Sequence, residues 1–333
     1  MFKLCCALLS CVIIAGCAKP NDPESLTQSS GGYAVVSKLA TSAYAQDVEV
    51  KDSLAYIVQG EGGLLIVNVA DRARPRIVAS CQEGVRGYSY KLALKDSIVY
   101  VAAATFGVNV VNVRNPLSPV AVASNIAIKP AKSFSVFGDY LFTSISESGV
   151  KIADITVPSQ PDIRGGIQNP GYAQALTTTQ DSAYLLVACG EMGVALFDVR
   201  DMQGGFGYYP QVGWTDLPGY AVDVATMGNR PIALVACGRG GVQVVDFSDT
   251  AHVRVIGSYA TGGYAKEIAY RNNRVYVTTE LRGLQILSVD DPSSPKLIGV
   301  IDTEFALGLA VDQKYVYVAD EEEGLIIISI PSY

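Results

Sequence analysis

One pattern of apolar and polar positions occurs seven times along the chain. Counting from a glycine, positions +1, +3, +4 and +6 are apolar or alanine in every copy, and position +5 is Asn, Asp or Ser. The seven glycines are Gly63, Gly107, Gly149, Gly193, Gly241, Gly283 and Gly324. Apolar residues on both faces of the pleat are typical of a strand that is covered on both sides. Each copy therefore predicts a buried middle strand, which begins at a tight glycine turn and ends where a short polar side chain can bond turn backbone.

The spacing of the copies predicts the fold. Successive glycines are 41–48 residues apart, and each interval holds four short strand signals. In the first unit these signals are 46–51, 53–58, 64–69 and 76–80. Proline at position +12 in four copies is expected to open the fourth strand, an outer edge where a missing N–H does little harm. Four strands per unit of about 40–45 residues are typical of a propeller blade. We therefore expect an all-β fold, a seven-bladed β-propeller of four-stranded antiparallel blades.

The two ends of the repeat region complement each other. The seventh unit has no fourth-strand signal, because the sequence continues only nine residues past Gly324. Residues 33–39 resemble 296–301, the fourth strand of unit six. We expect this N-terminal strand to complete the last blade, so that few strand edges stay unpaired. The propeller is predicted to span 33–333.

Unit four carries about five extra residues, since its proline is Pro210 at position +17. This insert, residues 202–209, is expected to place Phe206, Tyr208 and Tyr209 at the rim, near Trp214. The alternative is a loop packed on its own blade.

The first 32 residues differ from the repeats. Lys3 precedes an apolar run that is too short to span a bilayer and ends in Ile14-Ala-Gly-Cys17, which resembles a bacterial lipobox. We expect residues 1–16 to be a lipoprotein signal peptide and Cys17 to be lipidated; an ordinary signal peptide is the alternative. Residues 17–32 are polar and rich in Pro, Ser and Gly, which predicts a flexible tether. The residue after Cys17 is Ala18 rather than aspartate, which by resemblance to enterobacterial sorting favours the outer membrane of the bacterial cell envelope.

Charge and cysteine content exclude several classes. The net charge is −7 without a basic cluster, which argues against nucleic acid as a partner. Only Cys81, Cys189 and Cys237 fall in the repeats, an odd number that does not form a disulfide framework. Cys189 and Cys237 occupy equivalent positions and are expected to be small core residues, with a bridge between adjacent repeats as the alternative.

The glycine-plus-apolar runs, preceded by strands such as Val99-Tyr-Val-Ala102 and Val316-Tyr-Val-Ala-Asp320, resemble the LVIVD-repeat family of bacterial β-propellers. The resemblance covers roughly residues 33–333. It implies a secreted or surface propeller and no established activity.

Enzyme motifs are scarce. His252 is the only histidine, which excludes metal or catalytic sites built on several histidines. His252 lies in the turn 249–252, where a solvated loop residue is expected rather than part of a Ser-His-Asp set. No phosphate loop or dinucleotide fingerprint occurs in a strand–helix context. We expect no catalytic residues and no metal site.

Two positions recur on what should be one face of the propeller. The loop that enters each inner strand carries an aromatic residue in six units, and the turn between the second and third strands carries a glutamate in four. These residues are Tyr44, Tyr88, Tyr172, Tyr220, Tyr264 and Phe305, and Glu61, Glu147, Glu191 and Glu322. The two sets predict an aromatic and acidic binding face at the channel mouth, because tyrosine combines apolar area with a hydrogen-bonding tip. The alternative is that the aromatics plug the channel and wedge the blades, while the glutamates keep the turns solvated.

Two functions stay open at this stage. One is a membrane-anchored, extracytoplasmic, non-enzymatic binding or scaffolding propeller for a protein, peptide or glycan. The other is a propeller hydrolase that uses Asp or Glu residues at the channel mouth, with or without a divalent cation. The missing second histidine and nucleophile motif favour binding. No cofactor is expected; calcium at the acidic turn 320–323 is the alternative.

Overall fold

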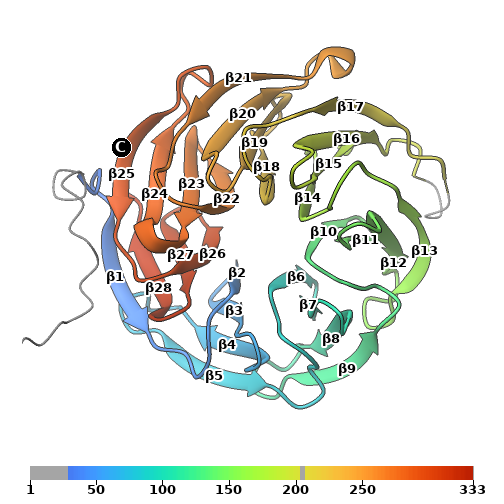
Figure 1. The fold of residues 1–333 in the computed structure, drawn as a ribbon. Coiled ribbons are helices and arrows are strands. Elements are labelled where there is room, and N and C mark those ends of the chain that lie inside the picture. The colour runs from blue at the N-terminus through green and yellow to red at the C-terminus, as the bar shows by residue number, and fades with distance from the viewer. Residues whose placement is uncertain (1–28, 203–206, 333) are drawn as a thin grey trace, which may run out of the picture.

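A computed structural model describes residues 29–202 and 207–332 of the chain. Seven four-stranded sheets are arranged in a ring (Figure 1), and their inner strands border a central cavity, the channel. The predicted all-β, seven-bladed propeller is confirmed. The signal segment, Cys17 and Phe206 lie outside the described residues. Among those described, no helix is long and apolar enough to cross a membrane.

Each blade runs from an inner strand at the channel to an outer strand at the rim. The strands of blades 1 to 3 are β2 (Asp47–Lys51), β3 (Leu54–Val58), β4 (Leu64–Asn68) and β5 (Arg76–Cys81); β6 (Lys91–Lys95), β7 (Ile98–Ala102), β8 (Val108–Asn112) and β9 (Val120–Asn125); and β10 (Ser133–Phe137), β11 (Tyr140–Ser144), β12 (Val150–Asp154) and β13 (Asp162–Ile167). Those of blades 4 and 5 are β14 (Ala175–Thr178), β15 (Tyr184–Ala188), β16 (Val194–Asp198) and β17 (Gln211–Thr215), and β18 (Asp223–Thr226), β19 (Ile232–Ala236), β20 (Val242–Asp246) and β21 (Arg254–Tyr259). Blade 6 contains β22 (Ala265–Arg271), β23 (Arg274–Thr279), β24 (Gly283–Ser288) and β25 (Lys296–Ile301). Two short 3-10 helices, η1 (Thr250–His252) and η2 (Glu280–Arg282), complete the described elements.

Blade 7 joins the two ends of the propeller. Its strands are β26 (Ala306–Val311), β27 (Tyr315–Asp320) and β28 (Gly324–Ser329), and the outermost strand is β1 (Ala34–Leu39). The antiparallel pairing of β1 with β28 runs from Ala34↔Ser329 to Leu39↔Leu325. A register shift interrupts the pairing of the outer strand in this blade, as it does in the six others. The predicted closure by the N-terminal strand is therefore confirmed, and β1 pairs like any other outer strand.

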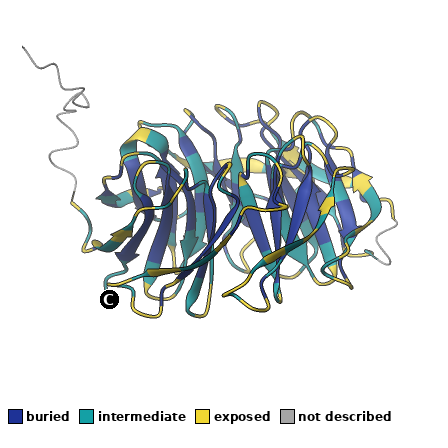
Figure 2. Cartoon of the chain, turned by 90° about the horizontal axis from the view of Figure 1, so that it is seen from below, coloured by how far each residue is buried: buried dark blue, intermediate teal, exposed yellow. Residues whose placement is uncertain are grey.

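The hydrophobic core is divided among the seven junctions between blades. Seven clusters of buried side chains each combine residues from two neighbouring blades. In β4, Leu65 and Val67 pack toward blade 7, whereas Leu64 and Ile66 pack toward blade 2. Figure 2 shows the result from the side: the strands are mostly buried and the loops at the two faces are exposed. Burial of both strand faces explains why the third strands lack apolar–polar alternation.

The signature glycines each meet an outer strand at close range. All seven have positive φ, between +65° and +83°. A Cβ added at these positions would lie 2.1–2.4 Å from the carbonyl oxygen of a residue in the outer strand or next to it. For Gly324 that oxygen belongs to Leu39 of β1. Only glycine combines this backbone conformation with this close approach.

The polar residue at +5 ends the third strand as expected. Its side-chain oxygen accepts a hydrogen bond from the N–H two residues later in six blades, for example from Ala70 to Asn68 at 2.9 Å. The outer strands begin directly after the prolines, as at Pro75 and Arg76. Both predictions are confirmed, and strand ends differ from the predicted ones by about one residue in the first blade.

The insert of unit four is only partly exposed. Tyr209 is buried and packs against the core between blades 3 and 4, whereas Tyr208 is 90% exposed. The Trp214 indole N–H donates to the carbonyl of Met192. Cys189 and Cys237 are buried free thiols, so the alternative of a bridge is wrong. Burial raises the pKa of both thiols to about 12.

Replacing Gly149 by alanine tests the glycine contact. The variant combines a left-handed backbone with a Cβ that lies 2.1 Å from the Ile167 carbonyl oxygen. We expect a loss of about 3 kcal/mol or more in the free energy of unfolding, measured by urea denaturation. Gly138→Ala is the matched control, because Gly138 has φ +54° and nothing within 4 Å of the added Cβ. It should lose only about 1 kcal/mol; equal losses would contradict the role of the close approach.

Candidate functional site

The predicted aromatic and glutamate positions lie at one end of the channel, which we call the mouth face. It consists of the loops that enter the inner strands and the turns between the second and third strands. Isolated backbone bridges connect the turn of one blade to the loop of the next, for example Gly60 to Ser89 and Gly190 to Ala221. Five of the blade junctions have such a bridge among the described residues. The prediction that both sets share one face therefore agrees with the backbone pairing.

Three of the tyrosines pack against glycines of the preceding blade. A Cβ at Gly60, Gly190 or Gly238 would lie 2.7–2.8 Å from the ring of Tyr88, Tyr220 or Tyr264, respectively. These glycines occupy the same turn position, three residues before the signature glycine. The three tyrosines are half-buried. They wedge adjacent blades together, as the structural alternative anticipated.

At the other junctions the residue at this turn position is not glycine, and the residue at the aromatic position is either replaced or packed differently. Ala104 stands in the equivalent position before Pro130, which replaces the aromatic. Ser146 and Glu321 precede Tyr172 and Tyr44, whose exposed fractions are 49% and 52%. Phe305, after Glu280, is half-buried. Tyr44 and Tyr172 are therefore the two predicted aromatics with the most surface available to a ligand.

The predicted glutamates are all exposed, and some lie beside these tyrosines. Burial raises the pKa of Tyr88 most strongly. The negative charges of nearby groups raise it further; these groups are Glu321, Tyr90, Tyr44 and Glu61. The rings of Tyr88 and Tyr90 lie 4.8 Å apart, centroid to centroid.

A second group lies at blades 4 to 6. Burial raises the pKa of Tyr220 most strongly, and the negative charges of Tyr264, Glu191 and Tyr172 raise it further. The Tyr220 hydroxyl also accepts a hydrogen bond of 3.0 Å from Gln174 Nε2. Glu147 and Glu322 are exposed on their own turns.

The acidic turn 320–323 is organised by Asp320, which is fully buried. Its Oδ2 accepts from the Phe305 N–H at 2.8 Å, and its Oδ1 accepts from the N–H groups of Glu322 and Glu323. Asp320 thus caps the turn. Within residues 29–202 and 207–332, no group of three or more His, Cys, Asp or Glu side chains is arranged to hold a metal ion.

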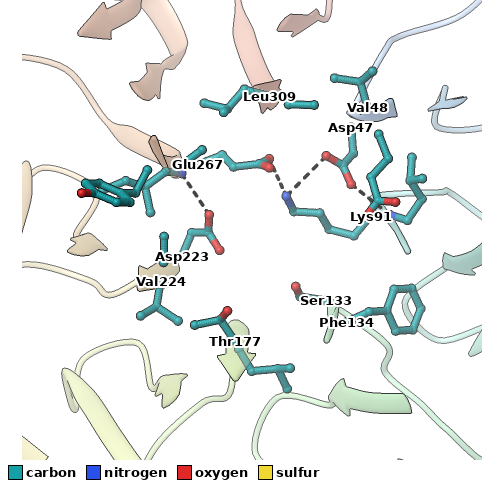
Figure 3. Close-up of a pocket in the computed structure, with 18 of the residues that line it drawn as sticks. Asp47, Val48, Lys91, Ser133, Phe134, Thr177, Asp223, Val224, Glu267 and Leu309 are labelled. Atoms are coloured by element: carbon teal, nitrogen blue, oxygen red, sulfur yellow. Dashed lines mark hydrogen bonds and ion pairs between the residues drawn. The ribbon is translucent and has the colours of Figure 1, made fainter. Parts of the chain in front are cut away.

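A charged cluster in the channel was not predicted from the sequence. Asp47, Lys91, Asp223 and Glu267, which we call the channel cluster, each stand three residues after the aromatic position of their blade. They line a cavity of about 370 Å³ that all seven inner strands border (Figure 3). This position also holds Ser133, Ala175 and Gly308, so its chemistry changes from blade to blade.

Lys91 connects blades that are not neighbours in the propeller. Its ammonium lies between Asp47 of blade 1 and Glu267 of blade 6, and forms ion pairs with both (Figure 3). Asp47 also accepts from the Leu92 N–H at 2.9 Å, and Asp223 accepts from the Ile268 N–H at 3.0 Å. The side chains of Lys91 and Glu267 keep 23% and 13% of their surface exposed, so water reaches the cluster.

The cluster contains more carboxylate than ammonium. Burial works against the charged form of Lys91, but Asp47, Glu267 and Asp223 together raise its pKa. Burial raises the pKa of Asp223 and Glu267, and Lys91 opposes that shift. Burial and the charge of Asp47 raise the pKa of the neighbouring Glu49 to about 8. Carboxyl groups with raised pKa values in a cavity mark candidate functional positions.

His252 is a solvated loop residue, as expected. Its side chain is 82% exposed, and Nδ1 lies 2.8 Å from Oδ2 of Asp249 in the same turn.

Glu49→Gln tests the electrostatics of the channel. Between about pH 4.5 and 8, the folded chain keeps a proton on Glu49 that the unfolded chain releases. The free energy of unfolding of the wild type therefore falls as pH rises through this window. Glutamine carries no such proton, so the variant should gain roughly 2–4 kcal/mol relative to wild type between about pH 5 and pH 8.

Urea denaturation at several pH values measures this difference. Glu147→Gln, on an exposed turn, is the control. A parallel gain in the control would place the pH dependence outside the channel, and a flat difference for Glu49→Gln would refute the prediction.

Comparison with known proteins agrees with the repeat pattern. The family model described as LVIVD repeat matches residues 42–83, 130–167, 218–261, 262–303 and 306–333, which is more than half of the chain. No curated protein sequence matches.

Solved structures share the fold at low sequence identity. A chain in the "Crystal Structure of Mitotic Checkpoint Complex" is 13% identical with a TM-score of 0.68, covering 100% of this chain and 99% of that one. The "Structure of U3-55K" is 9% identical with a TM-score of 0.70, covering 91% and 100%. The computationally designed Ika8 protein is 11% identical with a TM-score of 0.61, covering 89% and 99%. At these identities the likeness concerns the fold alone, while the repeat matches assign the chain to a family: it belongs to the LVIVD-repeat family.

Proposed function

We propose that this protein is a membrane-anchored, extracytoplasmic binding or scaffolding propeller that takes a protein, peptide or glycan on its mouth face. The observation that carries the proposal is the exposure of Tyr44 and Tyr172 on the mouth face, where the loop of Tyr172 is bridged to the preceding blade through Ala173 and Ser146. Exposed tyrosines bring large contact area at a small cost in conformational entropy. Because backbone bridges connect the loops at five of the junctions, that of Tyr172 included, little ordering of these loops is needed on binding.

Binding is favoured over hydrolysis by the state of the channel carboxylates. Asp47 and Glu267 are paired with Lys91, and Asp223 bonds the backbone N–H of Ile268. A general acid and base for hydrolysis need to reach the substrate at hydrogen-bonding distance. Groups that are engaged with each other support a structural role in holding the channel more directly than a catalytic one.

The proposed anchor is a lipid on Cys17, followed by a tether that leads to Ser29, where the described residues begin. A radioactive fatty acid should label the wild type in bacterial cells and not the Cys17→Ser variant. The label should follow the membrane fraction. Equal labelling of both proteins would contradict the anchor.

The double variant Tyr44→Ala/Tyr172→Ala tests the binding face. A panel of immobilised peptides and oligosaccharides is first screened with the full chain. Loss of two exposed anchors should weaken binding of the best probe about thirtyfold, which corresponds to about 2 kcal/mol. Tyr208→Ala, which removes a tyrosine that is 90% exposed at the rim, is the matched control. Equal affinity of the double variant and wild type, with loss in the control, would move the site to the rim.

A further inference from the structure

The mouth face carries an excess of negative charge. Its turns between the second and third strands hold seven glutamates against Arg239 and Arg282. The glutamates are Glu61, Glu147, Glu191, Glu280, Glu321, Glu322 and Glu323. At the opposite face, the turns between the first and second strands and their flanking residues hold five aspartates against six lysines and arginines. The entering loops add four carboxylates against Arg86, Lys129 and Lys132 on the mouth face. The turns between the third and fourth strands add five aspartates against four arginines on the opposite face, so the excess of carboxylates lies on the mouth face.

The acidic excess is greatest over blades 7 and 1. Glu61, Glu321 and Glu322 lie there, and Glu323 beside them forms an ion pair with Lys38 of β1; Arg239 and Arg282 lie on blades 5 and 6. Burial and then the like charges of Glu322, Asp320 and Glu280 raise the pKa of Glu321. Lys266 opposes this shift without cancelling it. In the channel cluster, Asp47 and Glu267 pair with the single lysine, and Asp223 adds a third carboxyl group to the same cavity.

Apolar surface is mixed with these carboxylates. Tyr44, Tyr172 and Tyr90 are 40–52% exposed on the loops. Phe106 and Leu281 are also exposed, on two of the turns that lack a glutamate at the recurring position. The face thus combines exposed apolar side chains with carboxylates on several of its turns.

One ammonium group already lies against this surface. Lys132 Nζ is 5.8 Å from the ring centroid of Tyr90, which is within the range of a cation–π contact. Lys132 comes from blade 3 and Tyr90 from blade 2. On this face, the ring of Tyr90 therefore already receives a cationic side chain.

Resting on the proposed function, we propose that the partner of the mouth face is a polypeptide segment with net positive charge. Its lysine or arginine side chains lie against the exposed tyrosines and beside the glutamates of blades 7 and 1. Charge complementarity of this kind speeds association and selects partners. A neutral glycan would use the tyrosines without the carboxylates.

Three synthetic peptides of equal length distinguish these cases: one with four lysines in a Gly/Ser background, one with glutamate in place of lysine, and one uncharged. A neutral oligosaccharide, cellohexaose, is the fourth probe. The full chain should bind the lysine peptide at least about tenfold more tightly than the other three, and raising salt from about 50 mM to about 300 mM should weaken that binding several-fold.

Charge variants locate the contact. Glu61→Gln/Glu321→Gln should weaken the lysine peptide about five- to tenfold. Asp52→Asn/Asp96→Asn is the matched control, because it removes two charges from the opposite face at positions with φ near +55°, which asparagine tolerates. No loss in the first pair, or an equal loss in both, overturns the inference.

The outcomes separate this inference from the proposed function. If cellohexaose or the uncharged peptide binds as well as the lysine peptide, and Tyr44→Ala/Tyr172→Ala still weakens it, the binding face stands and the cationic partner is wrong. If the tyrosine variant leaves every probe unaffected, the binding face is wrong as well. Absence of binding to the lysine peptide overturns the inference directly.

Discussion

The contact between each signature glycine and the outer-strand carbonyl determines how a blade is built. The chain turns from the second strand into the third at a glycine that lies directly against the end of the fourth. This approach fixes the position of the buried third strand relative to the rim, and the third strand supplies side chains to the packing on both sides. Since every junction between blades shares strands with the next, an error at one glycine affects two clusters of the core.

Closure of the propeller repeats the same contact with a different segment. Leu39 of β1 supplies the carbonyl that Gly324 approaches, and β1 has the same interruption in register as other outer strands. The junction of blades 7 and 1 contains a cluster like those elsewhere. Because β1 and β28 lie far apart in the sequence, opening this sheet requires separation of these two distant segments, which makes closure a long-range step in folding.

The sequence predicted the fold more fully than the site. The glycines and prolines recur at a regular period along the sequence. The blades could therefore be counted, and the strands of the first blade could be placed within about one residue. The shared face of the tyrosines and glutamates also followed from blade geometry. Lys91 and Glu267 could not be paired, because they come from blades 2 and 6 and their position holds a different residue type in each blade. The position three residues after each aromatic identifies the four residues of the channel cluster in the sequence, but it does not predict which of them contact one another.

The pairing of a tyrosine with the turn residue of the preceding blade has a consequence for how such surfaces diversify. A ring that lies on glycine is half-buried, and a ring that follows Ser146 or Glu321 is more exposed. The residue that sets the availability of a tyrosine is therefore one that a ligand on that tyrosine need not touch. In a repeat family, substitution at this turn position can switch individual contact sites on and off while the aromatic residues stay unchanged. Ligand recognition can then change at one blade junction at a time, through substitution of a turn residue that the ligand does not contact.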